Sequence, residues 1–323
     1  MSITYELIPL DTLFFRGNTP MEAGQNTATS LFPPPLSVLK GAFRSEAIRQ
    51  SGYDVKTYLS GNCDGLNALI GAPSDDNGLE IEQFFIKKQN RSFVPAPASW
   101  YLDSPAKPKT KKDYYKNKLT EALYRNKAMT ELHCFSSSEP LPFVHAETTA
   151  QPLNGIWISV DFLQSSKQQL NDEDFLLPGE IYVTENRIGV GLDSDKHTIE
   201  GKLCSASHIR LREDISFCVT LSEDVLKENT GAIPLGGEQR ICFYKKTEAI
   251  IFPRQDSSLF LSTIPVPATG TLLSKIFSSG KLYETAGWDL AKGFHKATIS
   301  WIPAGAVFNE KINQSCIALR NIN

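Results

Sequence analysis

The chain has 323 residues, of which 41% are hydrophobic and 21% are charged, and its formal net charge is −3. These values are typical of a globular protein and exclude a disordered chain, and the net charge excludes nucleic-acid binding through an overall basic surface. The length indicates two domains, because domains of roughly 100 to 200 residues are usual.

No apolar run approaches the roughly 18 residues that a membrane-spanning helix needs, and the N-terminal segment lacks the basic start of a secretory signal. We therefore expect a cytoplasmic protein with no membrane contact. The six cysteines form no CxxC pair, which is the spacing that metal and redox sites use. We expect buried free thiols, and we predict neither a bound metal nor a cofactor.

The N-terminal region predicts a strand followed by a loop. β-Branched and aromatic residues dominate positions 3–15, and Pro9 marks an edge or a bulge. Residues 17–30 are small and polar, which favours a loop. Arg16 stands where the strand ends, and two interpretations remain open: it binds a phosphate or a base edge, or it pairs with Asp11.

Residues 31–52 contain the clearest helix of the sequence. Prolines precede apolar residues that are spaced three or four positions apart, and Gly52 suits the end of the helix. Lys40 and Arg44 lie four positions apart on this helix. Since like charges at that spacing repel slightly, the pair is either accidental or serves an anion.

The middle of the chain combines short elements with one strongly basic segment. Hydrophobic periodicity predicts a strand at 79–88, a basic helix at 111–129, a helix at 158–170, a strand at 179–184, a hairpin at 185–201 and strands at 204–211 and 214–221. From Lys107 to Lys118 the segment holds six lysines and two tyrosines, opposed only by Asp113. It is either a solvated surface or a site where ammonium groups meet phosphates and rings stack on bases.

Two glycine-rich loops mark the last third of the chain. In the first loop, Gly236 and Gly237 precede Arg240 and a predicted strand. In the second loop, at 287–293, two glycines frame Trp288. Glycines let a backbone approach a ligand closely, and the alternative is a structural turn with the tryptophan in the core.

A helix around 272–277 and a hairpin at 297–312 complete the predicted elements. The order of strand, helix and strand pair occurs in both halves. This order predicts an α+β fold of two tandem ferredoxin-like domains with glycine-rich loops and a helical insertion in the first. The predicted N-terminal domain covers 1–212, with the lysine-rich insertion around 104–130, and the C-terminal domain covers 213–323.

Motifs of common catalytic sites are absent from the sequence, which has no GxSxG, no HExxH and no phosphate-binding P-loop. The five histidines show no ligand-like spacing, so surface or core positions are expected for them. His295 is the exception. It stands beside Lys296 after the second glycine loop, where a general base for RNA cleavage would be placed.

Five segments carry a family resemblance, and they are spread in order over nearly the whole chain. They are PLDTLFFRG at 9–17, LFPPPLSVLKGAFRS at 31–45, ENRIGVGLD at 185–193, LGGEQR at 235–240, and GWDLAKG with WIPAGAVF at 287–308. Together they resemble the third-subunit family of the type III-B CRISPR effector, the Cmr complex of the RAMP superfamily. At one position the chain departs from that pattern, because His295 stands where the family tends to have a proline before the lysine.

The resemblance implies two ferredoxin-like (RRM-like) domains and a non-catalytic RNA-binding subunit of an antiviral ribonucleoprotein. Such a subunit would hold the 5′ handle of the guide crRNA and bridge the large polymerase-like subunit to the repeated backbone subunit, meeting target RNA only indirectly. The residues predicted to bind RNA lie in the glycine-rich loops, near them or on the first helix, and we expect them to converge on a groove between the two domains. They are Arg16, Lys40, Arg44, Arg187, Gly236, Gly237, Arg240, Gly287, Trp288, Lys292, Gly293 and Lys296.

Two other functions remain open at the level of the sequence. One is a metal-independent endoribonuclease that processes repeat RNA, in which His295 and Lys296 would support attack by the 2′-hydroxyl. The other is a stand-alone binder of single-stranded RNA. Cleavage of repeat RNA in chelator would favour the enzyme, and co-purification with effector subunits would exclude the stand-alone binder.

Overall fold

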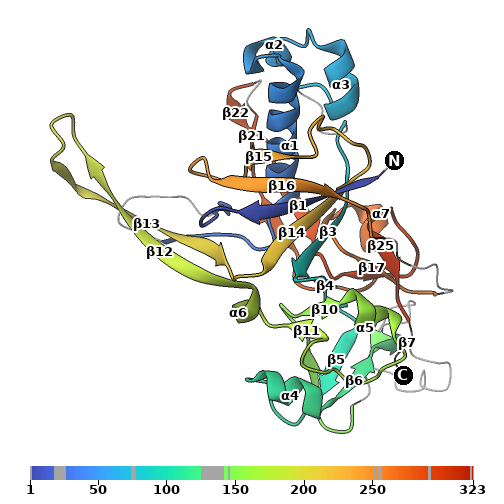
Figure 1. Cartoon of the computed structure of the whole chain (residues 1–323). Coiled ribbons are helices and arrows are strands. Elements are labelled where there is room, and N and C mark those ends of the chain that lie inside the picture. The colour runs from blue at the N-terminus through green and yellow to red at the C-terminus, as the bar shows by residue number, and fades with distance from the viewer. Residues whose placement is uncertain are drawn as a thin grey trace. The chain divides into compact units, whose positions relative to one another are not determined.

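The structure, a computed structural model, describes residues 2–17, 27–73, 78–124, 142–144, 146–250, 252, 257–289, 292–320 and 322. The chain divides into two compact units, each built from three segments (Figure 1). Unit 1 comprises Met1–Gln89, Gly179–Ile251 and Tyr283–Ser300, and unit 2 comprises Asn90–Pro178, Phe252–Leu282 and Trp301–Asn323. Most of the described strand pairs are antiparallel and most described helices are short, so the fold is mixed α/β.

Unit 1 contains an antiparallel sheet with the strand order β3-β14-β1-β16-β15. Its strands are β1 (Ile3–Pro9), β3 (Ile81–Lys88), β14 (Ile215–Leu221), β15 (Thr230–Pro234) and β16 (Ile241–Thr247). Strand β14 is buried along its whole length, as expected for an inner strand. The predicted first strand ends at Pro9 rather than at residue 15, because the chain then turns away and Leu13 bridges to Ile209.

Helix α1 (Leu36–Ser51) confirms the clearest helix prediction. Pro35 precedes it, and Gly52 ends it in the left-handed region with φ 82°, which costs glycine little because it has no Cβ. Phe43 is fully buried and its ring lies 4.9 Å from that of Tyr5 on β1. The apolar side of α1 therefore packs on the sheet, and Figure 1 shows the helix crossing behind β15 and β16.

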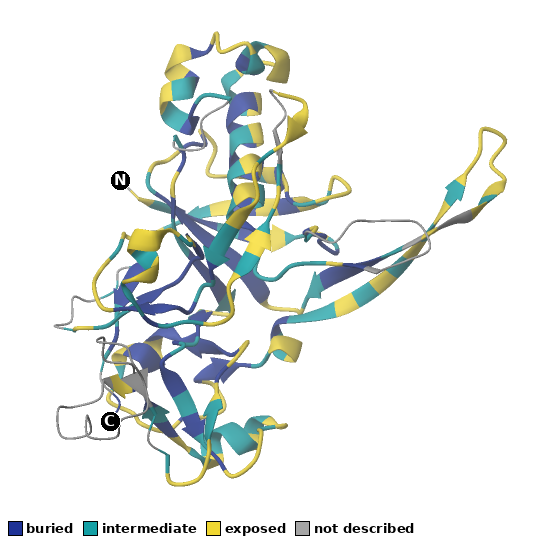
Figure 2. Ribbon diagram, turned by 180° about the vertical axis from the view of Figure 1, so that it is seen from behind, coloured by how far each residue is buried: buried dark blue, intermediate teal, exposed yellow. Residues whose placement is uncertain are grey.

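A long hairpin extends from the sheet of unit 1 (Figure 1). It consists of β12 (Tyr182–Leu192) and β13 (Thr198–Leu211), and Asp193 accepts hydrogen bonds from two backbone N–H groups in its turn. This confirms the predicted hairpin, although its strands are longer than the range 185–201. Burial alternates between half-buried and exposed along the outer part of β12, and Figure 2 shows this pattern on the ribbon. The other elements of unit 1 are β2 (Thr27–Thr29), α2 (Val55–Leu59), α3 (Asp64–Ile70), β20 (Tyr283–Thr285), β21 (Trp288–Asp289) and β22 (Phe294–His295).

Unit 2 consists of short strands and short helices. Its strand orders are β11-β10-β4, β6-β5-β9, β7-β8 and β19-β24-β17-β25. The strands are β4 (Arg91–Pro95), β5 (Trp100–Asp103), β6 (Lys118–Glu121), β7 (Leu123–Tyr124), β8 (Pro142–Phe143), β9 (Ala150–Pro152), β10 (Trp157–Ser159), β11 (Phe175–Leu176), β17 (Phe260–Ser262), β18 (Val266–Pro267), β19 (Ile276–Ser278), β24 (Val307–Phe308) and β25 (Cys316–Ala318). The helices are α4 (Lys111–Lys116), α5 (Val160–Gln164) and α7 (Gly270–Leu273). No described helix is long and apolar enough to cross a membrane.

Three helix predictions for this part of the chain are too long. The predicted helix at 111–129 ends at Lys116, because residues 118–121 form β6 and pair with β5; residues 125–129 lie outside the described part. The predicted helix at 158–170 is α5 alone, because Ile158 belongs to β10 and Ser165 is extended. The helix expected around 272–277 is α7, since residues 276–278 form β19.

Two strand predictions are also wrong in part. The strand expected at 179–184 begins only at Tyr182, after the short helix α6 (Pro178–Ile181). The hairpin expected at 297–312 does not form, because β23 (Ile299–Ile302) pairs with β18 whereas β24 pairs with β17 and β19. Gly305 turns the chain between these sheets with φ 92°, where a Cβ would lie 2.9 Å from the Ala96 carbonyl oxygen.

The predicted domain boundary at 212/213 separates β13 from β14, and both strands lie in unit 1. Unit 1 thus takes segments from both predicted halves. The assignment of residues 1–212 and 213–323 to two ferredoxin-like domains stays a prediction.

The described cysteine side chains are free and buried, which confirms the prediction for Cys63, Cys218, Cys242 and Cys316. Burial raises the pKa of both Cys218 and Cys242 to about 12. At pH 8 the reactive thiolate is then on the order of one part in ten thousand. We expect both thiols to stay unmodified by iodoacetamide in the native chain and to react in urea, as measured by peptide mass spectrometry. Equal labelling rates in the two states would contradict this expectation.

Candidate RNA interface

Three arginines from three elements of unit 1 meet at Asp11, just beyond the end of β1. Arg240, which precedes β16, donates to Asp11 Oδ2 through Nη1 at 2.7 Å. Arg210 of β13 donates to Asp11 Oδ1 through Nη2 at 2.9 Å, and Arg187 of β12 places Nη2 3.7 Å from Oδ2. Pairing of β12 with β13 brings Arg187 and Arg210 to this end of β1, where β16 brings Arg240.

Two more carboxylates complete this cluster, which we call the Asp11 cluster: Asp11, Glu185, Arg187, Arg210, Glu238 and Arg240. Glu185 accepts from Arg210, and Glu238 accepts from Arg240 Nη2 at 2.8 Å. The arginine hydrogen bonds hold the pKa of Glu185 and of Glu238 below the usual range, and the Thr12 backbone N–H does the same for the pKa of Asp11, aided by Arg210. The carboxylates are therefore ionised at neutral pH, and the formal charges of the cluster cancel.

The loop between β15 and β16 is built to place Arg240. Gly236 has φ 86°, and a Cβ there would lie 2.6 Å from the Phe14 carbonyl oxygen. That same oxygen accepts the Gly237 N–H at 2.8 Å. Glu238 and Gln239 follow with φ 57° and 52°, which is uncommon for residues with a side chain and stores strain.

His208 forms the floor beneath this loop. It is fully buried, its ring stacks on Phe14 with centroids 5.1 Å apart, and Nδ1 lies 3.3 Å from Thr12 Oγ1. Burial lowers the pKa of His208, so the ring is neutral at physiological pH. The core position expected for an isolated histidine is confirmed here.

The structure brings together Arg187, Gly236, Gly237 and Arg240 from the predicted site. Arg16 is exposed and bridges to Ser30 through its backbone. Lys40 and Arg44 are half-buried on α1, and Arg44 Nε donates to the Ile70 carbonyl at 2.8 Å, toward α3. All the residues predicted to bind RNA lie within unit 1.

The second glycine loop is a short hairpin of β21 and β22. Trp288 pairs with His295 through the backbone, and the Lys296 N–H donates to the Gly287 carbonyl at 2.9 Å. Gly293 takes φ 60° and Lys292 beside it is exposed. The Trp288 side chain lies outside the described part of the structure, so its stacking on a base stays a prediction. Phe294 lies on the same hairpin and is 68% exposed, so its ring is accessible for stacking. The sequence-based prediction did not include it.

Arg210 is the arginine of the Asp11 cluster that the sequence-based prediction missed. The predicted hairpin at 185–201 carries a signal for this residue. When its pairing continues beyond the predicted range, Glu185 lies opposite His208, and Arg210 becomes a diagonal neighbour of Glu185. One interpretation of the sequence pairs Asp11 with Arg16, whereas the structure pairs it with Arg187, Arg210 and Arg240.

The lysine-rich segment contains a well-anchored helix, α4, in unit 2. Thr110 and Asp113 form a capping box at the start of α4, so Asp113 has a structural task. The Tyr114 and Phe175 rings pack with their centroids 5.2 Å apart, and Lys111 Nζ lies 5.1 Å from the centroid of the Phe175 ring. One of the two tyrosines is therefore used in packing, and both interpretations of the segment, a solvated surface and an RNA-binding site, stay open.

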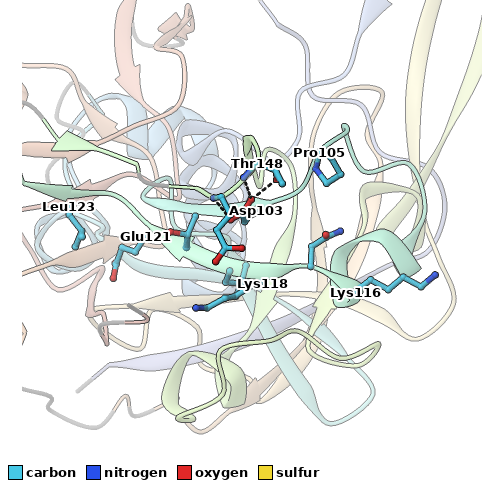
Figure 3. Close-up of a pocket in the computed structure, with 11 residues that line it drawn as sticks. Asp103, Pro105, Lys116, Lys118, Glu121, Leu123 and Thr148 are labelled. Carbon is cyan, nitrogen blue, oxygen red and sulfur yellow. Dashed lines mark hydrogen bonds between the residues drawn. The ribbon is translucent and has the colours of Figure 1, made fainter.

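The same segment borders a pocket of about 620 Å³ in unit 2, and Figure 3 shows Lys116, Lys118 and Asp103 among the residues that line it. Asp103 accepts hydrogen bonds from the Glu147 N–H at 2.7 Å and from Thr148 Oγ1 at 2.6 Å. The carboxylate thus holds the backbone around residue 148.

Comparisons with known proteins agree with the resemblance seen in the five segments. A family model described as "CRISPR-associated protein (Cas_Cmr3)" matches residues 5–269. The fold is similar to a chain in "Cryo-EM structure of the Type III-B Cmr-beta bound to cognate target RNA and AMPPnP, state 1", with 16% identity over 95% of this chain and 86% of that chain and a TM-score of 0.57. It is also similar to a chain in "Cryo-EM structure of the Type III-B Cmr-beta bound to cognate target RNA", with 17% identity over 96% and 86% and a TM-score of 0.56.

At these identities the structural matches show the fold alone, and the comparison with curated proteins found no match. The family model covers most of the chain, including the glycine loop at 235–240 and all members of the Asp11 cluster. The resemblance to the Cmr third-subunit family is confirmed, and the chain belongs to the family described as CRISPR-associated protein (Cas_Cmr3).

Proposed function

We propose that the chain is a non-catalytic RNA-binding subunit of a type III-B Cmr ribonucleoprotein and that it holds the 5′ handle of the guide crRNA. One observation carries the proposal: guanidinium groups of Arg187, Arg210 and Arg240 meet at one point beside the Gly236–Gly237 turn. Arginine forks are suited to phosphates, and glycine turns let the RNA backbone come close to protein N–H groups.

The hairpin of β21 and β22 supplies the other groups that a single-stranded handle needs. Lys292 and Lys296 add point charges, and the exposed ring of Phe294, with Trp288 on the paired strand, would stack on an unpaired base. The handle would thus be held by charge in the Asp11 cluster and by stacking on the hairpin.

Membership of the family supports the proposed partners, which are the large polymerase-like subunit and the repeated backbone subunit. The solved structures with a similar fold contain Cmr-beta with cognate target RNA. We propose that this chain meets target RNA only through the assembled complex. His295 ends β22 opposite Trp288, and the Lys296 side chain packs over Gly287.

The decisive experiment removes two of the guanidinium groups. We expect the double variant Arg187→Ala with Arg240→Ala to bind guide-handle RNA about 10- to 100-fold more weakly and to reduce the slope of log affinity against log salt by about 0.7 for each phosphate that is no longer neutralised. Fluorescence anisotropy over a salt series measures both. Arg44→Ala is a poorer choice, because Arg44 also bonds to Ile70.

A matched control removes two exposed lysines of unit 1, Lys56→Ala with Lys196→Ala, at α2 and at the tip of the β12–β13 hairpin. This control loses the same charge away from the cluster. Equal affinities and equal salt slopes for the two double variants, with both chains folded by thermal melting, would count against the proposed function.

A further inference from the structure

We propose that Asp11 is an internal competitor for RNA phosphate. In the chain without RNA its carboxylate occupies the point where the three guanidinium groups meet, and a phosphodiester group takes that place when guide RNA binds. The inference rests on the proposed function and adds to it a device that limits binding of other RNA.

The geometry is that of an anion already seated in an arginine site. Each carboxylate oxygen accepts a charged hydrogen bond, Oδ1 from Arg210 at 2.9 Å and Oδ2 from Arg240 at 2.7 Å, and Arg187 lies at 3.7 Å. The two non-bridging oxygens of a phosphodiester present the same paired acceptors to arginine forks. A phosphate group at this point would therefore meet donors that are already oriented.

Exposure makes such an exchange feasible. The side chains of Asp11, Arg187 and Arg210 are 42%, 38% and 43% exposed, and that of Arg240 is 19% exposed. The pairs of Asp11 with Arg187 and Arg210 are open to water, and such pairs contribute little to stability, whereas breaking a buried pair would leave an uncompensated charge. RNA binding is favoured in addition by the release of condensed counterions.

The Asp11 carboxylate also weakens the long-range electrostatic attraction between the arginines and RNA. With Glu185 and Glu238 it cancels the formal charges of the three arginines, so the RNA-free cluster presents no net positive charge to passing RNA. An RNA that is held elsewhere, on the β21–β22 hairpin, has a high local concentration at the cluster and displaces the carboxylate. RNA that does not engage the hairpin lacks that help, which produces specificity by penalising such RNA.

Backbone hydrogen bonds hold the chain on both sides of Asp11. The Leu10 N–H donates to Ile241 at 3.1 Å, and Leu13 exchanges hydrogen bonds of 2.7 and 2.8 Å with Ile209. Removing the carboxylate is therefore expected to leave the path of this segment unchanged. The Asp11 carboxylate also interacts with the Thr12 backbone N–H, and the amide oxygen of asparagine can accept that hydrogen bond as well.

The test compares the full chain with Asp11→Asn and with Glu223→Gln, an exposed acid of unit 1 whose loss changes the net charge equally. We expect Asp11→Asn to bind a scrambled single-stranded RNA about 3- to 10-fold more tightly at low salt. Its salt slope should steepen by about 0.7 for each additional phosphate that the arginines neutralise. The preference for handle RNA over scrambled RNA should fall, and Asp11→Glu should restore it.

Glu223→Gln should stay within about twofold of the parent chain. The proposal is overturned if Asp11→Asn and Glu223→Gln show the same affinity for scrambled RNA, the same salt slope and the same preference for handle RNA.

A second measurement separates this inference from the proposed function. Tripolyphosphate should raise the melting temperature of Asp11→Asn, and of a second neutral variant, Asp11→Ser, more than that of the parent chain. If no form of the chain binds handle RNA but this difference is found, the proposed function fails and the competitor stands. Normal handle binding with no difference in either assay overturns the competitor alone.

Discussion

Replacement of Gly236 by alanine is expected to lower the free energy of unfolding by about 2–4 kcal/mol. The residue has φ 86°, a region that alanine adopts only with strain, and its Cβ would lie 2.6 Å from the Phe14 carbonyl oxygen. That oxygen belongs to the backbone and already accepts the Gly237 N–H, so it cannot move aside without breaking this bond. Urea unfolding followed by circular dichroism measures the loss.

The same substitution is expected to displace Arg240, because the Arg240 carbonyl oxygen accepts the Leu235 N–H at 2.7 Å across the loop. The affinity of this variant for handle RNA should therefore fall, as well as its free energy of unfolding. Gly41→Ala is the control, since Gly41 is exposed on α1 and a Cβ there meets nothing within 4 Å. Alanine should stabilise that helix by about 0.5–1 kcal/mol. A loss of stability at Gly41, or none at Gly236, would contradict this account of the loop.

Local signals explain what the sequence could predict of the fold. Helix α1 was predictable because its prolines, its three- and four-residue apolar spacing and Gly52 all act within one segment. The hairpin of β12 and β13 was predictable for the same reason, since the acids of its turn and the flanking strands are adjacent in the chain. Neither prediction required knowledge of distant partners.

The errors arose where distant partners decide the structure. Residues 118–121 have enough helix-forming character to extend α4, yet they form β6 because β5 offers a strand to pair with. The strands on either side of Gly305 look like one hairpin, but each has a partner from elsewhere in unit 2. The local sequence pattern indicates that a segment forms a strand, but which strands it pairs with depends on the tertiary fold.

The candidate site shows the same division. Arg187 and Arg240 were predictable because each stands beside glycines in a loop or hairpin. The Asp11 cluster was not, because its members come from the N-terminal segment, the β12–β13 hairpin and the loop before β16, and only strand pairing brings these together. A carboxylate among three arginines is invisible in a sequence in which they stand far apart.

Replacement of Phe217 by alanine is expected to lower the free energy of unfolding by about 3–5 kcal/mol, because it removes a large side chain from the fully buried centre of the unit 1 sheet. The ring of Phe217 lies 5.5 Å from that of Phe84 and 6.1 Å from that of Phe32, and β14 is held between β1 and β3, so the surrounding chain has little freedom to close the cavity. Phe243→Ala is the matched control: this ring stands on β16 in the same sheet and the residue is 50% exposed, so we expect a loss below about 1 kcal/mol. Urea titrations of both variants measure the difference, and equal losses would mean that packing against β14 does not hold unit 1 together.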